Sequence, residues 1–486
     1  MLLKEIIDSI ETIKVVGTTE EQDIHVLSQD SRDANLENSL YIAVSGTQTN
    51  GHKFIDSAIE KGALAVVCEQ LPDRLLEQVT YIQVKDSRVS LSIIADVFYR
   101  HPSKKLKVIA VTGTNGKTTV VHYLAQTLKN LGQKPLLLST AGDYFDGQPI
   151  VVHRHAPSSV EIIELQKTLR QYVDGGATHV CLEATSQALD QERLLGIDID
   201  MAIFTNLGQD HLDYHTTIDN YAYSKKRLFN SLKSSAIAIS NADDPKGFWM
   251  IEDSPAETIR LYGTGECDYW FSITRADLNG MEIECNNTLL KAPVIGSFNA
   301  YNVVSVYASL IELGYEKTEI IKQLEILRGV PGRMESVHNH KSVLALVDYA
   351  HSPDALKSVL ETLATIPHKR ILTVIGCGGD RDKTKRAPMA RIAQQLSDSV
   401  IYTSDNPRTE AIQQIFDDMK NGVDNNRENY TFVESREEAI KNIVHTAHEG
   451  DIILVAGKGH EDYQIIGETK LHFDDREILN QYLNEN

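Results

Sequence analysis

Short apolar runs alternate with longer segments in which apolar residues recur every three or four positions. The runs are typical of buried strands, and the periodic segments are typical of amphipathic helices. "KVIAVTG" (107–113) and "KTTVVHYLAQTLKNLG" (117–132) are one strand followed by one helix of this kind. Polar loops that contain glycine follow most of the predicted strands. The pattern therefore predicts an α/β fold with mainly parallel sheets.

Breaks in this alternation divide the chain. A length of 486 residues is too great for one hydrophobic core and suggests about three domains. "HPSKK" (101–105) precedes a new strand, and Gly329, Pro331 and Gly332 interrupt the chain again. We predict an α/β domain over 1–104, a central P-loop ATPase-like domain with a mainly parallel sheet over 105–333, and a Rossmann-like domain over 334–486.

The composition is globular and strongly acidic. Apolar residues make up 42% and charged residues 24% of the chain, and the formal net charge is −20. This charge argues against a general affinity for nucleic acids or anionic membranes. The five cysteines form no CxxC pair, so neither a disulfide framework nor a zinc site is expected. The start does not resemble a signal peptide and no apolar run reaches ~18 residues, so we expect a cytoplasmic protein that does not cross a membrane.

The segment "VTGTNGKTTV" (111–120) has the features of a phosphate-binding loop. Because it lies between a predicted strand and a predicted helix, its backbone N–H groups and the helix N-terminus would face a polyphosphate. Lys117 would add a positive charge, and the Thr118 hydroxyl would suit Mg²⁺. The usual motif has a glycine where this chain has Val111. A chance glycine-rich turn is the alternative, which the flanking strand and helix disfavour.

Two further strand ends carry polar residues that suit a metal–nucleotide site. Glu183 ends the predicted strand in "THVCLEATSQALDQER" (178–193), and "MAIFTNLGQDHLDYH" (201–215) contains Asp210 and His211. A carboxylate at a strand end beside a P-loop is a usual Mg²⁺ partner. Taken alone, Glu183 could cap a helix and His211 could be structural. Together the three segments predict an ATP–Mg²⁺ site, which a kinase, a motor or a ligase could use.

Nine segments, taken in order, resemble the motifs of the Mur ligases. They are "GTNGKT", "FTNLGQDHLDYH", "YAYSKKRLF", "GSFNAYN", "PGRME", "DYAHSPDAL", "GCGGDRD", "SDNPR" and "GKGHEDYQ". The resemblance covers essentially the whole chain and is closest to the branch that adds the third amino acid of the peptidoglycan stem peptide. "GTNGKT" is this family's own form of the P-loop. The resemblance implies a uridine-nucleotide-binding N-terminal domain, a central ATP-binding domain and a C-terminal amino-acid-binding domain.

The resemblance also implies an ATP-dependent amide ligation. ATP would phosphorylate the D-glutamate γ-carboxylate of UDP-N-acetylmuramoyl-L-alanyl-D-glutamate, and an amine would attack the acyl phosphate. A carboxylate is a poor electrophile until phosphate makes one oxygen a leaving group, and cations must neutralise the developing charge. The expected partners are these small molecules and Mg²⁺, without nucleic acid or membrane, and we expect a monomer.

Matching motifs assign roles at the ATP site. Lys117, His211 and Lys225 are the catalytic candidates. The implied ATP-binding residues are Gly113, Thr114, Asn115, Gly116, Lys117, Thr118, Thr119, Asn299, Arg333 and Asp348. The implied metal ligands are Thr118, Glu183, His211 and Lys225. Lys225 would be a carbamate (N6-carboxylysine), because an ammonium repels a metal whereas a carbamate offers it oxygen. The neighbouring Lys226 is expected to be a solvated surface lysine.

The other two substrates have their own implied residues. The UDP-muramoyl-dipeptide set is Ser31, His155, Ala156, Thr185, Gln191 and Arg193. The amino-acid set is Arg381, Asp405, Asn406, Pro407, Arg408, Gly457 and Glu461. Arg193 could equally form a surface salt bridge. His351 could lie near the nucleotide or cap a helix.

Arg408 suggests which amino acid is added. "SDNPR" follows an apolar strand, and its Asp, Asn and Pro suit a turn, but a turn does not require arginine. Members that add meso-diaminopimelate resemble this chain in having arginine there. Diaminopimelate differs from lysine by a distal carboxylate, which a guanidinium can bind with two hydrogen bonds. We therefore expect meso-diaminopimelate.

Two departures from the family pattern leave alternatives open. The chain has His155-Ala156-Pro157 where Thr-Thr-Pro is usual, and Thr185-Ser186-Gln187 where Ser-Ser-His is usual. A paralogue that uses L-lysine or a modified nucleotide-linked acceptor is the first alternative. A folylpolyglutamate synthetase is disfavoured by the uridine-type first domain. A nucleotide-binding protein without turnover is disfavoured by the retained metal set.

Overall fold

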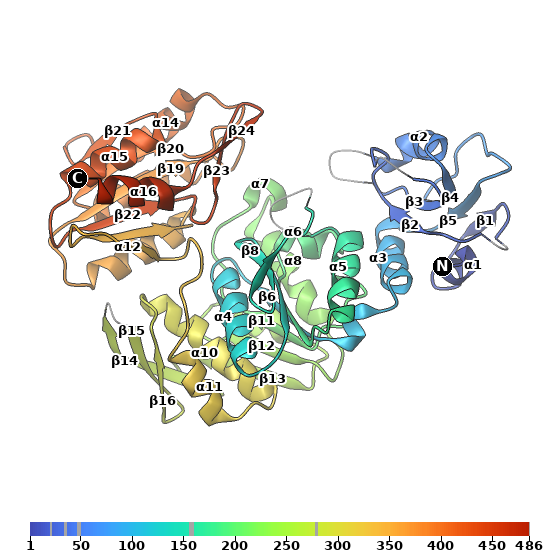
Figure 1. Ribbon diagram of the computed structural model, residues 1–486, viewed down its shortest axis with the longest axis horizontal. Helices are drawn as coiled ribbons and strands as arrows, with labels where there is room; N and C mark the ends of the chain where they lie inside the picture. The colour runs from blue at the N-terminus through green and yellow to red at the C-terminus, as the bar shows by residue number, and fades with distance from the viewer. Residues whose placement is uncertain (20–21, 34–35, 46–49, 155–159, 278–279, 486) are drawn as a thin grey trace.

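The computed structural model describes residues 1–19, 22–33, 36–45, 50–154, 160–277 and 280–485 (Figure 1). Three sheet-centred parts follow one another along the chain, and the first and last lie on different sides of the central part. The α/β fold with mainly parallel sheets is confirmed. No helix among the described residues is long and apolar enough to span a membrane.

The first part has a five-stranded sheet in the order β1-β5-β4-β3-β2, in which only β1 is antiparallel. Its elements are α1 (Leu3–Ile7), β1 (Lys14–Val16), β2 (Val26–Ser28), β3 (Ser39–Ile42), η1 (Gly51–Phe54), α2 (Ile55–Glu60), β4 (Ala63–Cys68), β5 (Thr80–Gln83), α3 (Ser87–Phe98) and η2 (Pro102–Lys105). In this part, β3, α2 and β4 follow one another along the chain as strand, helix and strand.

The central part is built on an eleven-stranded sheet in the order β16-β15-β14-β13-β12-β11-β6-β10-β7-β8-β9. Its first half contains β6 (Lys107–Thr112), α4 (Lys117–Asn130), β7 (Pro135–Ser139), β8 (Gly142–Phe145), β9 (Gln148–Ile150), α5 (Ile162–Asp174), β10 (His179–Glu183), α6 (Ser186–Asp190) and β11 (Met201–Phe204). Its second half contains α7 (Leu212–His215), α8 (Ile218–Asn230), β12 (Ile237–Asn241), α9 (Gly247–Ile251), β13 (Thr258–Gly263), β14 (Tyr269–Asp277), β15 (Gly280–Cys285), β16 (Thr288–Ala292), α10 (Ser297–Glu312) and α11 (Lys317–Leu324).

The last part has a six-stranded sheet in the order β17-β18-β22-β19-β20-β21, in which only β17 is antiparallel. Its elements are β17 (Glu335–Val337), β18 (Leu344–Asp348), α12 (Pro353–Ala364), β19 (Ile371–Cys377), α13 (Arg386–Leu396), β20 (Ser399–Ser404), α14 (Ile412–Lys420), β21 (Tyr430–Phe432), α15 (Arg436–Thr446), β22 (Ile452–Ala456), β23 (Tyr463–Ile466), β24 (Thr469–His472) and α16 (Asp475–Asn484). The Rossmann-like prediction fits this sheet.

The register of the central sheet brings the predicted motifs together. Glu183 pairs with Val111, and Phe204 pairs with Thr112, so β10, β6 and β11 end at one edge. Ligands of open α/β sheets bind at such carboxyl edges. The predicted helix after the phosphate loop is α4, which ends just before Gly132, whose φ is 82°.

Apolar packing joins the first and central parts. One buried cluster runs from Leu3 on α1 to Ala256, before β13, and includes residues from both sheets. α3 packs on α5, and the Ser92 hydroxyl donates to the Glu192 carbonyl at 2.9 Å. The central sheet has its own second cluster beneath α4 and α10, and the last sheet is covered on both faces.

A fully buried ion pair ties together the strand ends of the last part. Arg436 binds Asp475 through two hydrogen bonds of 2.7 Å, and both side chains are 0% exposed. The same guanidinium donates to the carbonyls of Ser404 and Ala456, the last residues of β20 and β22. Both strands lead into predicted site loops, so this pair supports the base of the site.

We expect Asp475→Ala to lower the free energy of unfolding by roughly 3–5 kcal/mol, because it leaves the Arg436 charge buried without its partner. Urea titration followed by circular dichroism measures this loss. Glu477→Ala on the same helix is the control, since Glu477 makes only an exposed contact with His472. Equal losses in the two variants would contradict the role of the buried pair.

Candidate active site

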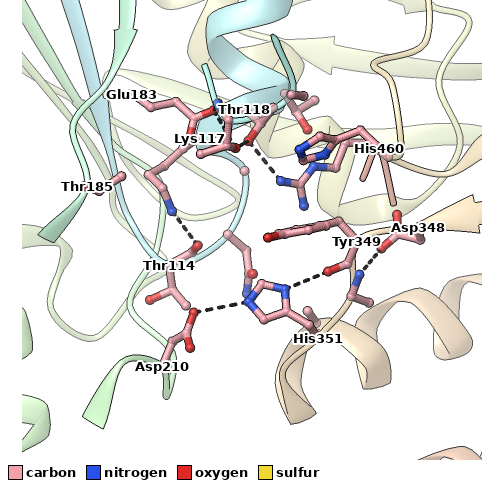
Figure 2. A pocket seen from close by; sticks show the side chains of 18 of the residues that line it. Thr114, Lys117, Thr118, Glu183, Thr185, Asp210, Asp348, Tyr349, His351 and His460 are labelled. Carbon is pink, nitrogen blue, oxygen red and sulfur yellow. Dashed lines mark hydrogen bonds and ion pairs between the residues drawn. The ribbon is translucent and has the colours of Figure 1, made fainter. Parts of the chain in front are cut away.

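A cleft of about 1330 Å³ lies where the central and last parts meet. Figure 2 shows part of its lining, with Lys117 and Glu183 from the central part opposite Tyr349 and His460 from the last part. Most of the residues that the sequence implicates line this cleft. The lining members are Thr114, Asn115, Gly116, Lys117, Thr118, Thr119, Glu183, Thr185, Gln191, Arg193, His211, Asn299, Arg333, Asp348, Arg381, Asp405, Asn406, Arg408, Gly457 and Glu461.

Close packing shapes the phosphate loop. Gly113 has a φ of 147°, and a Cβ there would lie 1.9 Å from the Thr205 hydroxyl oxygen. The Asn206 side chain accepts from the Asn115 backbone N–H at 2.9 Å and donates to the Asn115 carbonyl at 3.1 Å. Gly116, with a φ of 89°, precedes the first turn of α4. The loop after β11 therefore fixes the loop after β6.

Two lysines converge on one carbonyl of this loop. Lys117 Nζ donates to Gly113 O at 2.9 Å and to Thr114 O at 2.8 Å. Lys225 Nζ donates to the same Gly113 oxygen at 2.8 Å, from behind the loop, and does not line the cleft. Burial lowers the pKa of Lys225 well below its ordinary value, and the nearby Lys117 charge adds to the effect.

Thr118 and Glu183 share a neighbour that the sequence does not mark. Thr140 donates its backbone N–H to Glu183 Oε1 at 2.9 Å, and its hydroxyl contacts Glu183 at 3.2 Å and the Thr118 hydroxyl at 3.3 Å. Arg333 Nη2 donates to Thr118 Oγ1 at 3.0 Å. A guanidinium from the link to the last part therefore reaches the phosphate loop. Glu183 is the last residue of β10, and Thr185 caps the helix that comes next.

His211 lies in a cluster that joins the two parts. The Asp210 carboxylate is 3.5 Å from His211 Nε2 and 3.7 Å from His351 Nε2 (Figure 2). His351 Nδ1 donates to the Tyr349 carbonyl at 2.8 Å. Burial lowers the pKa of His211 to about 4, so its imidazole is neutral at physiological pH. Ser352, and not His351, caps α12.

The predicted metal ligands fit Mg²⁺ in their chemistry. Thr118 and Glu183 both contact Thr140, and the His211 imidazole is neutral. In the described chain, no three His, Cys, Asp or Glu side chains gather as a metal site. Only Glu183 and His211 of the predicted set are residues of these kinds, because the other two ligands are the Thr118 hydroxyl and the carbamate that is expected on Lys225.

Arg333 and Asp348 both line the cleft. The Arg333 guanidinium stacks over the Tyr349 ring at 4.6 Å, and its Nε is buried without a partner. Asp348 accepts from the backbone N–H groups of Met334 at 2.7 Å and Ala350 at 2.8 Å, and burial raises its pKa. Asp348 thus holds the start of the last part beside the cleft.

The amino-acid motifs meet at the far end of the cleft, and we call Arg381, Asp405, Asn406, Arg408, Gly457 and Glu461 the amine pocket. Arg408 has a φ of 54°, and its Nη1 donates to the carbonyls of Gly379 at 2.7 Å and Asn406 at 3.3 Å. Asn406 Nδ2 donates to Glu461 Oε2 at 2.8 Å. Pro407 belongs to the same loop but does not line the cleft.

The implied acceptor residues are only partly brought together. Arg193 pairs with Glu161 at 2.8 Å and donates to Gln191 at 2.8 Å, and its side chain is 12% exposed. This ion pair is therefore partly buried. Thr185 caps α6 beside it.

Three acceptor positions do not join this group. Ser31 is buried in the first part, where its carbonyl accepts from Lys61, and it does not line the cleft. His155 and Ala156 lie outside the described residues.

The positions of three side chains, Lys226, Tyr349 and His460, differ from the sequence prediction or were not predicted from the sequence. Lys226 was expected at the surface, but it is 2% exposed and pairs with Glu252 and Asp253. This prediction was wrong because tertiary packing buries that face of α8 against α9. Tyr349 lies in the segment "DYAHSPDAL" and His460 in "GKGHEDYQ". The spacing of residues in these segments does not predict that either side chain lines the site. Their rings lie 5.1 Å apart in the cleft wall.

We expect Lys117→Met to reduce ATP-dependent turnover by at least ~10²-fold, because it removes the cation that would neutralise the transferring phosphoryl group. Steady-state release of inorganic phosphate measures the effect. Lys129→Met, in the exposed last turn of the same helix, should leave turnover unchanged. Near-normal turnover of Lys117→Met would remove the loop from the mechanism.

Family models match in three segments: Mur ligase family, catalytic domain, over residues 23–99; Mur ligase middle domain over 111–310; and Mur ligase, glutamate ligase domain, over 332–459. The three matched segments follow one another along the chain in the same order as the three sheet-centred parts.

Similar proteins extend over the whole chain. A ligase of Bacteroides fragilis named UDP-N-acetylmuramoyl-L-alanyl-D-glutamate--2,6-diaminopimelate ligase is 40% identical over 99% of both chains. The protein of the same name from Cytophaga hutchinsonii is 41% identical, again over 99% of both. A solved structure of a ligase with that name is 33% identical, covers 99% of this chain and 98% of its own, and has a TM-score of 0.68. The chain therefore belongs to the Mur ligase family.

Proposed function

We propose that this protein is an ATP-dependent ligase that adds meso-diaminopimelate to UDP-N-acetylmuramoyl-L-alanyl-D-glutamate during peptidoglycan precursor synthesis. The observation that carries the proposal is the cleft, where a phosphate loop faces a pocket with carboxylate and guanidinium groups. The full-length relatives named for this reaction support it. Because the substrates are ATP and a nucleotide-linked precursor, we also propose a cytoplasmic enzyme. One chain supplies every residue invoked, so a monomer suffices.

The reaction has two balanced steps. A γ-carboxylate oxygen of the D-glutamate attacks the γ-phosphorus of ATP, and the bond from that phosphorus to ADP breaks. The amine nitrogen then attacks the acyl carbon and loses a proton. The bond from that carbon to the bridging oxygen breaks, and inorganic phosphate leaves with this oxygen. Lys117 and Arg333 would neutralise the phosphoryl oxygens from opposite walls of the cleft.

Thr118, Glu183, His211 and a carbamate on Lys225 would hold Mg²⁺. When bound, the ion would supply Lewis-acid neutralisation of the phosphate charge. Arg333 already donates to the Thr118 hydroxyl, so that oxygen would have to exchange this partner for the ion.

The surroundings of Lys225 favour its conversion to a carbamate. Carbamate formation needs a neutral amine: the nitrogen attacks CO₂, an N–C bond forms and one proton leaves. The side chain is 1% exposed and lies beside Lys117, and these surroundings lower its pKa, so the neutral form is favoured. In this structure the amine donates to Gly113 O, and the carbamate nitrogen would keep one N–H for that bond.

We expect Lys225→Ala to have almost no ligase activity and to regain part of it when a short carboxylate such as formate is added. The added carboxylate would supply the missing oxygen ligand. Phosphate release with all substrates present is the measurement. The same addition should not rescue Lys117→Met, and a wild-type crystal with a bare ammonium at full activity would contradict the carbamate.

The amine pocket favours meso-diaminopimelate over L-lysine. Arg408 Nη1 donates to the backbone carbonyls of Gly379 and Asn406. That anchoring leaves Nε and Nη2 in the fork geometry that suits a carboxylate. With lysine, these donors would remain unpaired. A paralogue that uses L-lysine or a modified acceptor remains the second candidate because of the His155-Ala156-Pro157 departure.

We expect the wild type to prefer meso-diaminopimelate to L-lysine by ~10³-fold or more in kcat/KM, because a site built for a polar group rejects an analogue without it. Arg408→Ala should lose most of this preference and keep its affinity for ATP. Arg391→Ala, exposed on α13, is the control. Equal use of both amino acids by the wild type would refute the role of Arg408.

The decisive experiment combines phosphate release with mass spectrometry of the product. The wild type receives ATP, UDP-N-acetylmuramoyl-L-alanyl-D-glutamate and a mixture of candidate amino acids. Phosphate release that requires both co-substrates identifies a ligase, and the product mass identifies the amine. Phosphate release without the dipeptide, or none at all, would overturn the proposal.

A further inference from the structure

A lysine to which the sequence analysis gave no role lies buried beside the amine pocket. Lys458 stands between Gly457 and Gly459, whose φ angles are 112° and 53°. A Cβ at Gly457 would lie 2.9 Å from Asp405 Oδ2, and one at Gly459 would lie 2.7 Å from Tyr349 Cβ. The two glycines therefore let this turn pack against both neighbouring loops. The turn encloses the Lys458 side chain, which is 0% exposed.

The Lys458 ammonium binds two members of the amine pocket. Its Nζ donates to Asn406 Oδ1 at 3.2 Å and to Glu461 Oε2 at 3.2 Å. Asn406 Nδ2 donates to the same Glu461 oxygen at 2.8 Å. The three side chains therefore form a closed ring of hydrogen bonds. Glu461 N also donates to the Lys458 carbonyl at 2.9 Å, so both ends of the ion pair belong to one turn.

This ring of hydrogen bonds fixes the orientation of the Asn406 amide and of the Glu461 carboxylate. Asn406 Oδ1 also accepts from the Ile465 backbone N–H at 3.0 Å. With two donors directed at Oδ1, only one orientation of the amide satisfies its partners. Glu461 Oε2 takes two donors in the ring, which leaves Oε1 to accept from a group bound in the cleft. The Glu461 side chain is 15% exposed and lines that cleft.

Burying an ammonium is costly unless it is paired and hydrogen-bonded. An apolar side chain would fill the same space without this cost, so packing alone does not explain a lysine here. Its partners are two side chains implicated in amine binding. The Nζ also lies 5.4 Å from the centre of the Tyr463 ring, another residue of the cleft wall.

We propose that Lys458 is a positioning residue of the amine pocket. By holding Asn406 and one oxygen of Glu461, it directs the other carboxylate oxygen of Glu461 toward an ammonium group of the incoming amino acid. The proposal rests on the proposed function, because it takes Asn406 and Glu461 as amine-binding residues.

Lys458→Met tests this role, because methionine fills similar space without a donor. The KM for meso-diaminopimelate should rise on the order of 10- to 100-fold, as expected when a buried partner of a charged group is lost. The KM for ATP and for the UDP-linked dipeptide should stay within about twofold of the wild type, a margin well below the tenfold that corresponds to 1.4 kcal/mol. A purely structural role would instead lower stability and leave the ratio of the three KM values unchanged, which would overturn the proposal.

A matched control is available on the same aromatic ring. Lys470, exposed on β24, places its Nζ 3.8 Å from the centre of the Tyr463 ring. Lys470→Met should leave all three KM values unchanged. Lys458→Gln is a second variant in case the methionine variant does not fold. Its shorter side chain cannot reach Asn406 and Glu461 together, so the KM for meso-diaminopimelate should rise as well. A wild-type KM in either folded variant would overturn the proposal.

A crystal structure separates this proposal from the proposed function. In Lys458→Met or Lys458→Gln, the Asn406 amide and the Glu461 carboxylate should take new orientations, which can be seen without turnover. Unchanged orientations would overturn the positioning role. A wild type that does not ligate meso-diaminopimelate would overturn the proposed function while leaving the orientation result to stand.

Discussion

The site depends on the Gly113 carbonyl, where two lysine side chains meet. Lys117 reaches it from the cleft side and Lys225 from behind the loop. Two ammonium groups on one carbonyl repel each other, and burial adds to the cost of both charges. The phosphates of a bound nucleotide would draw Lys117 forward, and loss of charge on Lys225 would remove the repulsion. Nucleotide binding would thus replace the hydrogen bond from Lys117 to the Gly113 carbonyl with a contact to phosphate.

The second constraint is that neither wall of the cleft is complete by itself. The central part supplies the phosphate loop and Glu183, whereas Arg333 and Tyr349 come from the link and the start of the last part. Asp210 lies close to one imidazole from each side. The proposed reaction would require both walls, because the phosphoryl group would be transferred to an oxygen of the γ-carboxylate and the amine would attack the carbon of the same carboxylate.

Sequence reasoning succeeded where the chemistry is local and failed where it depends on tertiary packing. The strand–loop–helix at Lys117 and the strand end at Glu183 follow from hydrophobic periodicity, and both are confirmed. Thr140 carries no motif, and it joins Thr118 to Glu183 only because β7 pairs with β10. Lys226 looked like a surface residue because no periodic pattern shows that α9 covers it. Such contacts are set by neighbouring elements and not by spacing.

The net charge of the chain and the individual cations of the cleft act over different distances. A net charge of −20 opposes the approach of anionic substrates, but at physiological ionic strength its field is screened over about 8 Å. Within the cleft, Lys117 and Arg333 act at hydrogen-bond distance, where screening by ions is weak. The overall charge would therefore influence how often the proposed substrates arrive, and the local cations would determine whether they stay. In the amine pocket, the buried cation of Lys458 also acts at hydrogen-bond distance, but it positions the Glu461 carboxylate and does not bind a substrate itself.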